Sequence, residues 1–237
     1  MQRYFASIID NNVILNKDDI FHITKVMRMK NGENIQVVDQ ESHKAYLAVI
    51  KSVNPLEVVV QEPILEDVEL NKEVTLFFAL AKSDKIDLVI QKATELGASK
   101  VVLFQGKRSV VKFSMEDFNR KKERYLNIAK EAAEQCHRQR IPEIEYVGDI
   151  KGINNHLCDV NLFAYELEAG KSTNLAKVVD TAKSISIIIG PEGGFDEGEA
   201  NYLKSLNFVP VSLGKRILRC ETAAVYALSV ISYLLDK

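Results

Sequence analysis

The chain has 237 residues, of which 46% are hydrophobic and 27% are charged, an ordinary balance for a globular protein of one large domain or two modest ones. No apolar run is long enough to cross a bilayer, and the first residues lack the apolar segment of a signal peptide, which predicts a cytoplasmic protein with no membrane partner. The three cysteines form no CxxC pair and the four histidines show no zinc-ligand spacing. We therefore expect neither a disulfide framework nor a metal site.

The formal net charge of −2 gives no overall reason to expect a nucleic acid as partner, so a polyanion would have to bind a local patch. One such patch lies between residues 105 and 140, where ten Lys and Arg residues occur with five Asp and Glu residues, an excess of +5. Charge runs on helices are usually just solvated faces. The excess therefore leaves both interpretations open.

Short β-strands dominate the first part of the chain, where apolar runs are separated by turn signals of the Asn-Gly and Asn-Pro type. This spacing predicts a small β-barrel domain over residues 1–70, interrupted by one helix that Asp18 or Asp19 caps. The apolar positions of the helix are Ile20, Ile23, Val26 and Met27. The expected strands cover Tyr4 to Ile8, Val13 to Leu15, Asn34 to Val38, Ala45 to Val53 and Leu56 to Gln61.

The pattern changes after an acidic, aperiodic segment at residues 65–73, which we interpret as a linker. Over residues 74–237, apolar strands alternate with helices, which predicts an α/β domain with a parallel sheet. Asp196 and Glu199 match a capping box. The last helix, about Glu221 to Leu235, is apolar nearly all round, which predicts burial in the core or against another subunit. The other expected elements are strands at Thr75 to Leu80, Val101 to Phe104, Leu162 to Tyr165, Ile185 to Ile189 and Val209 to Leu213, and two helices, one capped by Ser83 or Asp84 and ended by Gly97, the other from Phe118 to Gln139.

A loop almost without side chains follows one of the buried strands. The run Ile187-Ile188-Ile189 ends in Gly190-Pro191-Glu192-Gly193-Gly194, and glycine permits close approach of the backbone to a ligand. Because ligands of open α/β sheets bind beyond the carboxyl ends of the strands, this loop is a candidate binding site. A similar loop around Gly214 follows another strand, and together the two predict one site. The alternative is a tight turn that only positions a helix, the commonest reason for clustered glycines.

The kind of ligand follows from what the loops lack. The run Ala169-Gly170-Lys171-Ser172 fails as a phosphate-binding P-loop, because Tyr165 stands where the motif needs glycine. Glu166 and Glu168 would also meet triphosphate oxygens. With Glu192 in the glycine loop, the pattern favours a ligand with cationic or neutral groups. S-adenosylmethionine fits that description, although the chemistry alone does not single it out.

The second loop combines two arginines with an apolar pair. Arg216 and Arg219 flank Ile217-Leu218, and Glu221 opens the final helix, where the helix dipole favours a carboxylate. Two interpretations stay open. In one, Arg219 and Glu221 form an ion pair that braces the turn. In the other, the backbone and the apolar pair hold an adenine while Arg219 faces an anionic substrate.

Several separated motifs resemble those of the RsmE family of SPOUT-class methyltransferases, which modify N3 of a uridine in 16S ribosomal RNA. The resemblance covers nearly the whole chain. Arg3-Tyr4-Phe5 and the region His22 to Arg28 resemble the PUA-like RNA-binding barrel of the family, whereas Cys136-His137 and Cys220 depart from the family pattern. The remaining motifs are Lys82 to Asp87, Gln91 to Gly97, Lys107 to Val110, Glu131 to Gln135 with Arg138, Ile141-Pro142, the Gly190 loop, and Leu213-Gly214 through Ala223.

The resemblance implies a SPOUT-type domain over residues 74–237 with a trefoil knot at the cofactor site, S-adenosylmethionine as cofactor, and a homodimer. The implied substrate is a specific uridine of 16S ribosomal RNA, either as free RNA or in the small ribosomal subunit. Arg219 is the candidate that stabilises the uracil anion, and the base that removes the proton is not identified. The expected cofactor-binding residues are Tyr165, Glu166, Leu167, Gly190, Pro191, Glu192, Gly193, Gly194, Ser212, Leu213, Gly214, Ile217, Leu218 and Thr222. The expected RNA-binding residues are Arg3, His22, Arg28, Lys82, Lys85, Arg108 and Arg138.

Two alternatives remain at this point. The chain could be an RNA-binding or ribosome assembly factor that has kept the fold and lost catalysis. It could also be the same type of enzyme acting on another RNA or another atom. Binding of S-adenosylmethionine separates the first alternative from the enzyme, and mapping of the methylated nucleotide decides the second.

Overall fold

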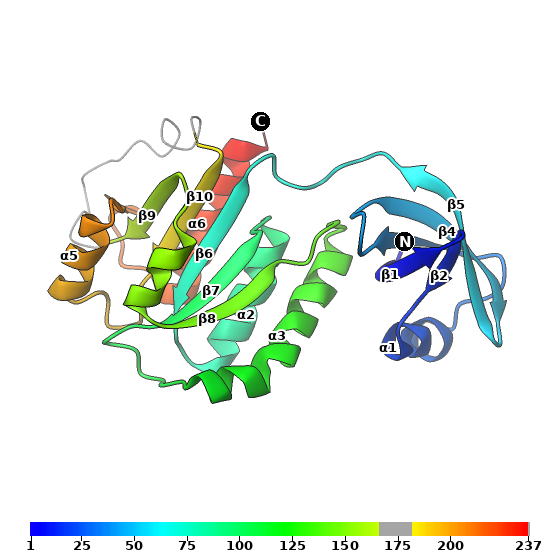
Figure 1. The fold of residues 1–237 in the computed structure, drawn as a ribbon, viewed down its shortest axis with the longest axis horizontal. Helices are drawn as coiled ribbons and strands as arrows, with labels where there is room; N and C mark the ends of the chain where they lie inside the picture. Colours follow the sequence, from blue (N-terminus) through cyan, green and yellow to red (C-terminus); the bar gives the residue numbers. More distant parts are fainter. Residues whose placement is uncertain (166–181, 237) are drawn as a thin grey trace. The chain divides into compact units, whose positions relative to one another are not determined.

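The computed structural model describes residues 1–165 and 182–236 (Figure 1). The chain divides into two compact units. The first unit consists of residues 1–69 and 133–140, and the second of residues 70–132 and 141–237. Nothing in the sequence pattern indicated that residues 133–140 belong with the first unit.

The first unit is a closed β-barrel with strand order β1-β2-β5-β4-β3. The parallel pairing of β1 with β3 closes it, and the other neighbours pair antiparallel. Alternate residues point inward, as the period of a strand requires, and Tyr4, Val37 and Ile50 are fully buried among them. The barrel confirms the predicted fold of this region. The strands are β1 (Arg3–Ile9), β2 (Asn12–Ile14), β3 (Asn34–Asp39), β4 (Ala45–Val53) and β5 (Leu56–Ile64).

The helical segment of the barrel differs from the prediction. Helix α1 (Lys17–Phe21) is capped by Asn16, whose side chain accepts a hydrogen bond from the backbone N–H of Asp19, so neither predicted aspartate is the cap. A π-helical turn, η1 (His22–Val26), continues it. Of the four predicted apolar positions, only Ile23 is buried. Ile20, Val26 and Met27 are exposed.

The second unit is built on a six-stranded sheet of order β11-β9-β10-β6-β7-β8, in which every neighbouring pair is parallel (Figure 1). The parallel α/β prediction is therefore confirmed. Strand β8 was not predicted, because it is an edge strand with few apolar positions. The strands are β6 (Glu73–Ala79), β7 (Lys100–Gln105), β8 (Glu143–Asp149), β9 (Val160–Ala164), β10 (Ser184–Ile189) and β11 (Val209–Val211).

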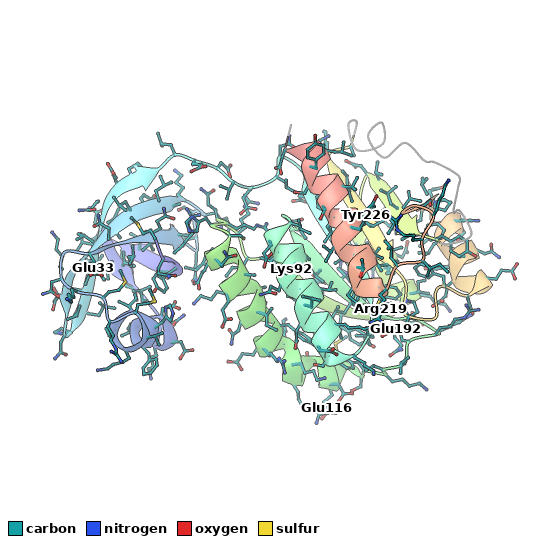
Figure 2. The ribbon with its side chains drawn as sticks, turned by 180° about the vertical axis from the view of Figure 1, so that it is seen from behind. Glu33, Lys92, Glu116, Glu192, Arg219 and Tyr226 are labelled. Atoms are coloured by element: carbon teal, nitrogen blue, oxygen red, sulfur yellow. The ribbon has the colours of Figure 1, made fainter. Side chains whose placement is uncertain are left out.

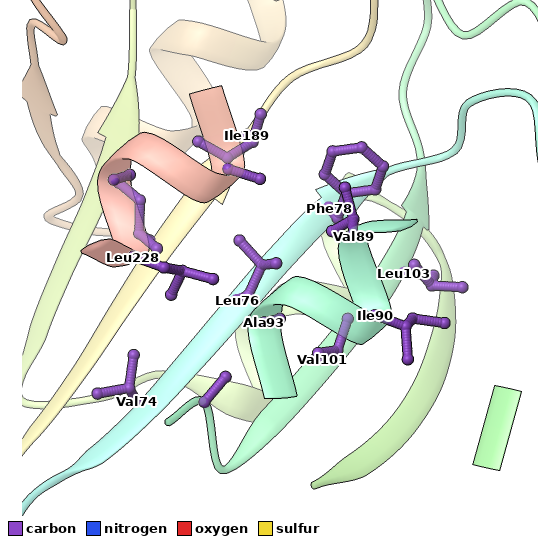
Figure 3. Close-up of a cluster of buried hydrophobic side chains, with 14 of the residues drawn as sticks. Val74, Leu76, Phe78, Val89, Ile90, Ala93, Val101, Leu103, Ile189 and Leu228 are labelled. Carbon is purple, nitrogen blue, oxygen red and sulfur yellow. The ribbon is translucent and has the colours of Figure 1, made fainter. Parts of the chain in front are cut away.

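Helices cover both faces of this sheet. Helices α2 (Ser83–Glu95), α3 (Met115–Gln135) and α6 (Cys220–Leu235) cover one face, and the 3-10 helix η2 (Ile150–His156) and α5 (Glu197–Ser205) cover the other. Successive residues of β6 serve the two cores in turn. Leu76 and Phe78 pack toward α2 and α6 (Figure 3), whereas Phe77 and Ala79 pack toward α5.

The observed helix caps agree in part with those predicted from the sequence. The capping box of α5 is confirmed: Asp196 accepts from the backbone N–H of Glu199, and Glu199 accepts from that of Asp196. Gly97 follows the end of α2 with a φ of +84°, as predicted. The start of α2 differs, since Lys82 occupies the cap position without a capping side-chain hydrogen bond.

Two expectations fall partly outside the described residues. Residues 166–181 lie in the chain path between β9 and β10, so the trefoil knot stays a prediction. Glu166 and Leu167 also fall outside the described residues, as does the rejected P-loop run. Among residues 1–165 and 182–236, no helix is both long and apolar enough to cross a membrane.

The glycine after α2 provides a test of the packing. A Cβ built on Gly97 would lie 2.6 Å from Cδ1 and 2.7 Å from Cγ of Leu70, whereas Gly148, with a φ of +75°, has nothing within 4 Å of its Cβ position. We expect Gly148→Ala to lower the free energy of unfolding by about 1–2 kcal/mol, from the left-handed backbone alone. Gly97→Ala should lower the free energy of unfolding by about 1–3 kcal/mol more than Gly148→Ala does, because Leu70 must move. Urea unfolding of both variants measures these free energies. Equal losses of stability would show that Leu70 moves aside at no cost.

Candidate functional site

The strand order of the second unit reverses between β6 and β10. Strands β7 and β8 continue from β6 to one side, whereas β10, β9 and β11 lie on the other (Figure 1). Ligands of open α/β sheets bind at such a switch point, beyond the carboxyl ends of the strands. A cavity of about 670 Å³ lies there, a size typical of small-molecule sites.

Two loops form most of this cavity. The loop after β10 contributes Gly190, Pro191, Glu192, Gly194 and Phe195, and the loop after β11 contributes residues 212–219. Tyr165 borders the cavity just beyond the end of β9, and Lys85 borders it from the first turn of α2. The parallel sheet brings these segments together because all its strands end at the same edge.

Most of the predicted cofactor-binding residues line the cavity. Glu166 and Leu167 fall outside the described residues. Gly193 and Thr222 are described but do not line the cavity, and Arg219, predicted to act on the substrate, does. Those that line it as predicted are Tyr165, Gly190, Pro191, Glu192, Gly194, Ser212, Leu213, Gly214, Ile217 and Leu218. Those that sequence reasoning missed or assigned elsewhere are Lys85, Ala164, Ile189, Phe195, Lys215, Arg216, Cys220 and Ala223.

Neighbouring side chains leave little room for a Cβ at two glycines of the first loop. A Cβ on Gly190 would lie 3.0–3.2 Å from the ring of Phe195, which is buried below the loop. A Cβ on Gly193 would lie 2.9 Å from Cβ of Arg108. Gly193 does not line the cavity, and its contact with the cofactor stays a prediction. Its backbone carbonyl accepts a hydrogen bond from Nη1 of Arg108 at 3.0 Å.

The loop after β7 braces the same segment. The backbone N–H of Lys107 donates to the buried carboxylate of Glu199 at 2.8 Å, and Nζ of Lys107 lies 2.6 Å from Asp196. Lys107 and the backbone N–H of Glu199 hold the pKa of Asp196 below its ordinary value. Lys107 and Arg108 are therefore tied to the loop that carries Glu192.

A cluster of charges lies at the start of α2 and α6. Nζ of Lys85 lies 3.3 Å from Oε1 of Glu192 and 3.2 Å from Oε2 of Glu221, with Sγ of Cys220 at 3.9 Å. Burial lowers the pKa of Lys85, but Glu221 and Glu192 outweigh it and raise that pKa overall. Burial, together with a hydrogen bond to Glu221, raises the pKa of Cys220 to about 11. At neutral pH the cluster is thus an ammonium between carboxylates, beside a protonated thiol.

Arg219 is exposed, and Figure 2 places it with Glu192 near one end of α6. Within the described residues, Glu221 forms its ion pair with Lys85. This arrangement disfavours the interpretation in which Arg219 and Glu221 brace the turn, and it leaves the Arg219 guanidinium beside the cavity.

Two of the predicted RNA-binding residues are buried inside the first unit. Arg138 is 4% exposed, and its Nη2 lies 2.7 Å from Glu69, which also accepts from the backbone N–H groups of Gln139 and Arg140. Arg3 is 5% exposed and donates to the backbone carbonyl of His137. We correct both assignments, because these guanidinium groups bind the protein itself and hold residues 133–140 in place.

The other predicted RNA contacts lie at or near the surface. Arg28, Lys82 and Arg108 are exposed. His22 is half-buried, and its Nδ1 hydrogen-bonds the hydroxyl of Tyr4 at 2.9 Å. Burial raises the pKa of Tyr4 to about 12, so this hydroxyl stays protonated and holds the imidazole in a fixed orientation. Lys85 belongs to the charge cluster of the cavity instead.

The cavity suits a ligand that combines an apolar ring with polar groups, and the Glu192 carboxylate in its lining is paired with Lys85. Leu213 and Leu218 offer apolar surface, the glycine loops offer backbone donors and acceptors, and Glu192 offers a carboxylate. Within the part of the chain that the structure describes, no cluster of His, Cys, Asp and Glu side chains could hold a metal ion.

Comparison with known proteins agrees with this arrangement. A family of RNA methyltransferase domains matches residues 68–232, and a family of RNA methyltransferase PUA domains matches residues 15–62. Ribosomal RNA small subunit methyltransferase E of Bacillus subtilis is 36% identical, over 98% of this chain and 96% of that protein. The protein of the same name from Mesomycoplasma hyopneumoniae is 31% identical, over 97% and 98%.

Solved structures of methyltransferases are also similar to this chain. A ribosomal RNA small subunit methyltransferase E from Neisseria gonorrhoeae, bound to S-adenosyl methionine, superposes with a TM-score of 0.88 at 25% identity, over 99% of this chain and 98% of that one. A putative methyltransferase from Legionella pneumophila, in complex with the same cofactor, gives a TM-score of 0.87 at 28% identity, over 98% and 97%.

A barrel that matches PUA domains, followed by a parallel α/β domain with a cavity at its switch point, defines the class of RNA methyltransferases that carry a PUA domain. The chain belongs to the ribosomal RNA small subunit methyltransferase E family. The family inferred from the sequence motifs is thereby confirmed.

The buried arginine of the first unit can be tested against an exposed lysine. We expect Arg138→Met to lower the free energy of unfolding of the first unit by about 3–5 kcal/mol, because it leaves the Glu69 carboxylate without its buried partner. Lys82→Met should change stability by less than about 0.5 kcal/mol, since Lys82 is exposed. Urea unfolding monitored by circular dichroism measures both. A stable Arg138→Met variant would return Arg138 to the candidates for RNA contact.

Proposed function

We propose that this protein transfers the methyl group of S-adenosylmethionine to N3 of a specific uridine in 16S ribosomal RNA. The observation that carries the proposal is the cavity at the switch point, formed by two backbone-rich loops with a carboxylate and several cations. Family membership supports the reaction type, and the cofactor-bound relatives support the methyl donor. Because the substrate is ribosomal RNA, we place its action in the cytoplasm.

The methyl donor supplies an electrophilic methyl group on a sulfonium, so the protein needs no covalent nucleophile. Its tasks are to hold the donor, exclude water and present the uracil nitrogen in line with the methyl group. Leu213 and Leu218 provide the apolar contact for the adenine, and the backbones around Gly190 and Gly214 provide hydrogen bonds. Arg219 stabilises the negative charge that develops on the uracil.

The two units divide the remaining work. The barrel, predicted as the domain of residues 1–70, binds RNA through the surface around His22 and Arg28. Lys82 and Arg108 add phosphate contacts on the domain of residues 74–237. Such contacts position the RNA more than they select its sequence. The partner is the 16S RNA, free or within the small ribosomal subunit.

Cofactor binding and product mapping test the function together. We expect S-adenosylmethionine to bind the purified protein in calorimetry, and Leu218→Asp to weaken it at least about tenfold by placing a charge in the apolar lining. Leu157→Asp, at an exposed leucine away from the cavity, is the matched control. With 16S RNA from cells that lack this protein, wild type should produce N3-methyluridine, detected by mass spectrometry of nucleosides.

Each outcome of this experiment has a distinct meaning. A folded protein that does not bind the cofactor would support an assembly factor without catalysis. A methylated nucleotide at another atom or in another RNA would refute the target and keep the enzyme class.

A homodimer is part of the proposal. Tyr226 and Tyr233 lie seven residues apart on α6, hence on one helix face, and are 45% and 67% exposed. Leu88 of the adjacent helix α2 is also exposed. Two exposed tyrosines on one face of α6 favour association with a second copy.

The dimer prediction concerns this face of α6. We expect wild type to sediment as a dimer, and the double variant Tyr226→Asp/Tyr233→Asp to sediment as a folded monomer, because two carboxylates would be desolvated at the interface. Leu157→Asp again serves as control. A double variant that stays dimeric would place the interface on another surface.

A further inference from the structure

The proposed reaction contains a proton transfer for which no residue has been identified, and the inference that follows rests on that function. N3 of a neutral uridine carries a hydrogen, so the nitrogen must lose a proton before or as it attacks the methyl group. A positioned side chain speeds such a transfer by roughly 10²–10⁴-fold. The acceptor has to lie in the cavity where the uracil and the methyl donor meet.

The groups lining the cavity leave few acceptors. Glu192 is the only carboxylate among the lining residues that the structure describes. The ammonium of Lys85 is held protonated by its two carboxylates, and the thiol of Cys220 is protonated at neutral pH. The remaining charged residues of the lining are cations: Lys215, Arg216 and Arg219.

We propose that Glu192 is the general base that accepts the N3 proton of the uridine, and that Lys85 is the positioning residue that aims its carboxylate. Nζ of Lys85 lies 3.3 Å from Oε1 of Glu192, and the Glu192 side chain is 25% exposed, so it is held and still reachable from the cavity. The second ion pair of Lys85, with Glu221, ties the ammonium to the first turn of α6.

The ion pair of Lys85 and Glu192 joins elements from the two sides of the switch point of the sheet. Lys85 lies in the first turn of α2, which follows β6, and Glu192 follows β10, the strand that pairs with β6. Helix α2 packs on the sheet through Ile86 and Val89, both fully buried, so the base of the Lys85 side chain is rigidly placed. A loop carboxylate is thus oriented by a residue on a rigid helix.

Charged groups from several elements lie near Glu192. They include Arg108, which donates to the carbonyl of the next residue, Gly193, and the cavity-lining Lys215 and Arg216. Lys85 approaches it from α2, and Cys220, Glu221 and Arg219 lie at the start of α6. Lys85 and Arg219 stabilise the negative charge that the uracil acquires. Glu221 accepts from Lys85 and does not line the cavity, so it keeps the ammonium in place without competing for the uracil proton.

The transfer conserves atoms and electrons. The N3–H bond breaks and its proton passes to the Glu192 carboxylate. The electron pair on N3 forms the bond to the methyl carbon, and the bond from that carbon to sulfur breaks. The sulfur keeps the electron pair of that bond and becomes a neutral thioether, and Glu192 later releases its proton to water.

Glu192→Gln tests the role, since it keeps the size and shape of the side chain but cannot take up a proton. We expect single-turnover methylation of the 16S RNA at pH 7 to fall at least about 100-fold. S-adenosylmethionine affinity, measured by calorimetry, and the melting temperature should stay near those of wild type. The difference in methylation rate between Glu192→Gln and wild type should become smaller as the pH rises, because the uridine imide then ionises without a base. Glu197→Gln, an exposed acid in the first turn of α5, is the matched control.

Lys85 has its own test. Lys85→Met should lower the methylation rate and change the pH profile, and Lys85→Arg should recover much of the rate by restoring a cation beside Glu192. A purely structural Lys85 would shift the melting temperature and leave the pH profile of the remaining activity as in wild type.

The outcomes separate this inference from the proposed function. If wild type forms N3-methyluridine and Glu192→Gln is equally fast, Glu192 is not the base. The same holds if the Glu192→Gln defect is constant with pH or matches a loss of cofactor affinity. If wild type forms no N3-methyluridine at all, the proposed function fails first.

Discussion

The position of β10 between β6 and β9 is the constraint on which the site depends. Parallel pairing aligns the carboxyl ends of these strands, so the loop after β10 lies next to the start of α2 and to the end of β9. Residues 107 positions apart in the sequence then meet as Lys85 and Glu192. A strand placed elsewhere in the order would keep every local motif and lose the cavity.

This constraint separates what the sequence could predict from what it could not. The strands, the capping box at Asp196 and the glycine loops are local signals, and ten of the predicted cofactor-binding residues line the cavity. Strand order is not local, because hydrophobic periodicity says which face of a strand is buried and nothing about its neighbours. Lys85 was therefore predicted as an RNA contact, when its partners are two carboxylates far along the chain.

The two buried arginines show a second limit. The family resemblance predicts Arg3 and Arg138 as RNA contacts, and the sequence pattern predicts a linker at the acidic segment of residues 65–73. In the structure, Glu69 of that segment binds the Arg138 guanidinium and two backbone N–H groups, so it holds residues 133–140 in the first unit. A charged residue in a sequence has no visible partner, and burial of a charge can be inferred only when the partner is known.

The charge cluster at the cavity is better explained by chemistry than by stability. An ion pair at a partly exposed position adds little to folding, since desolvation offsets most of the attraction. A proton that moves from N3 to Glu192 transfers negative charge from the carboxylate to the uracil, and the net charge of the cavity stays the same. Lys85 and Arg219 then attract the new anion as they attracted the old one, without reorganisation of solvent. Fixed cations around a negative charge that moves from the carboxylate to the uracil are what this reaction requires.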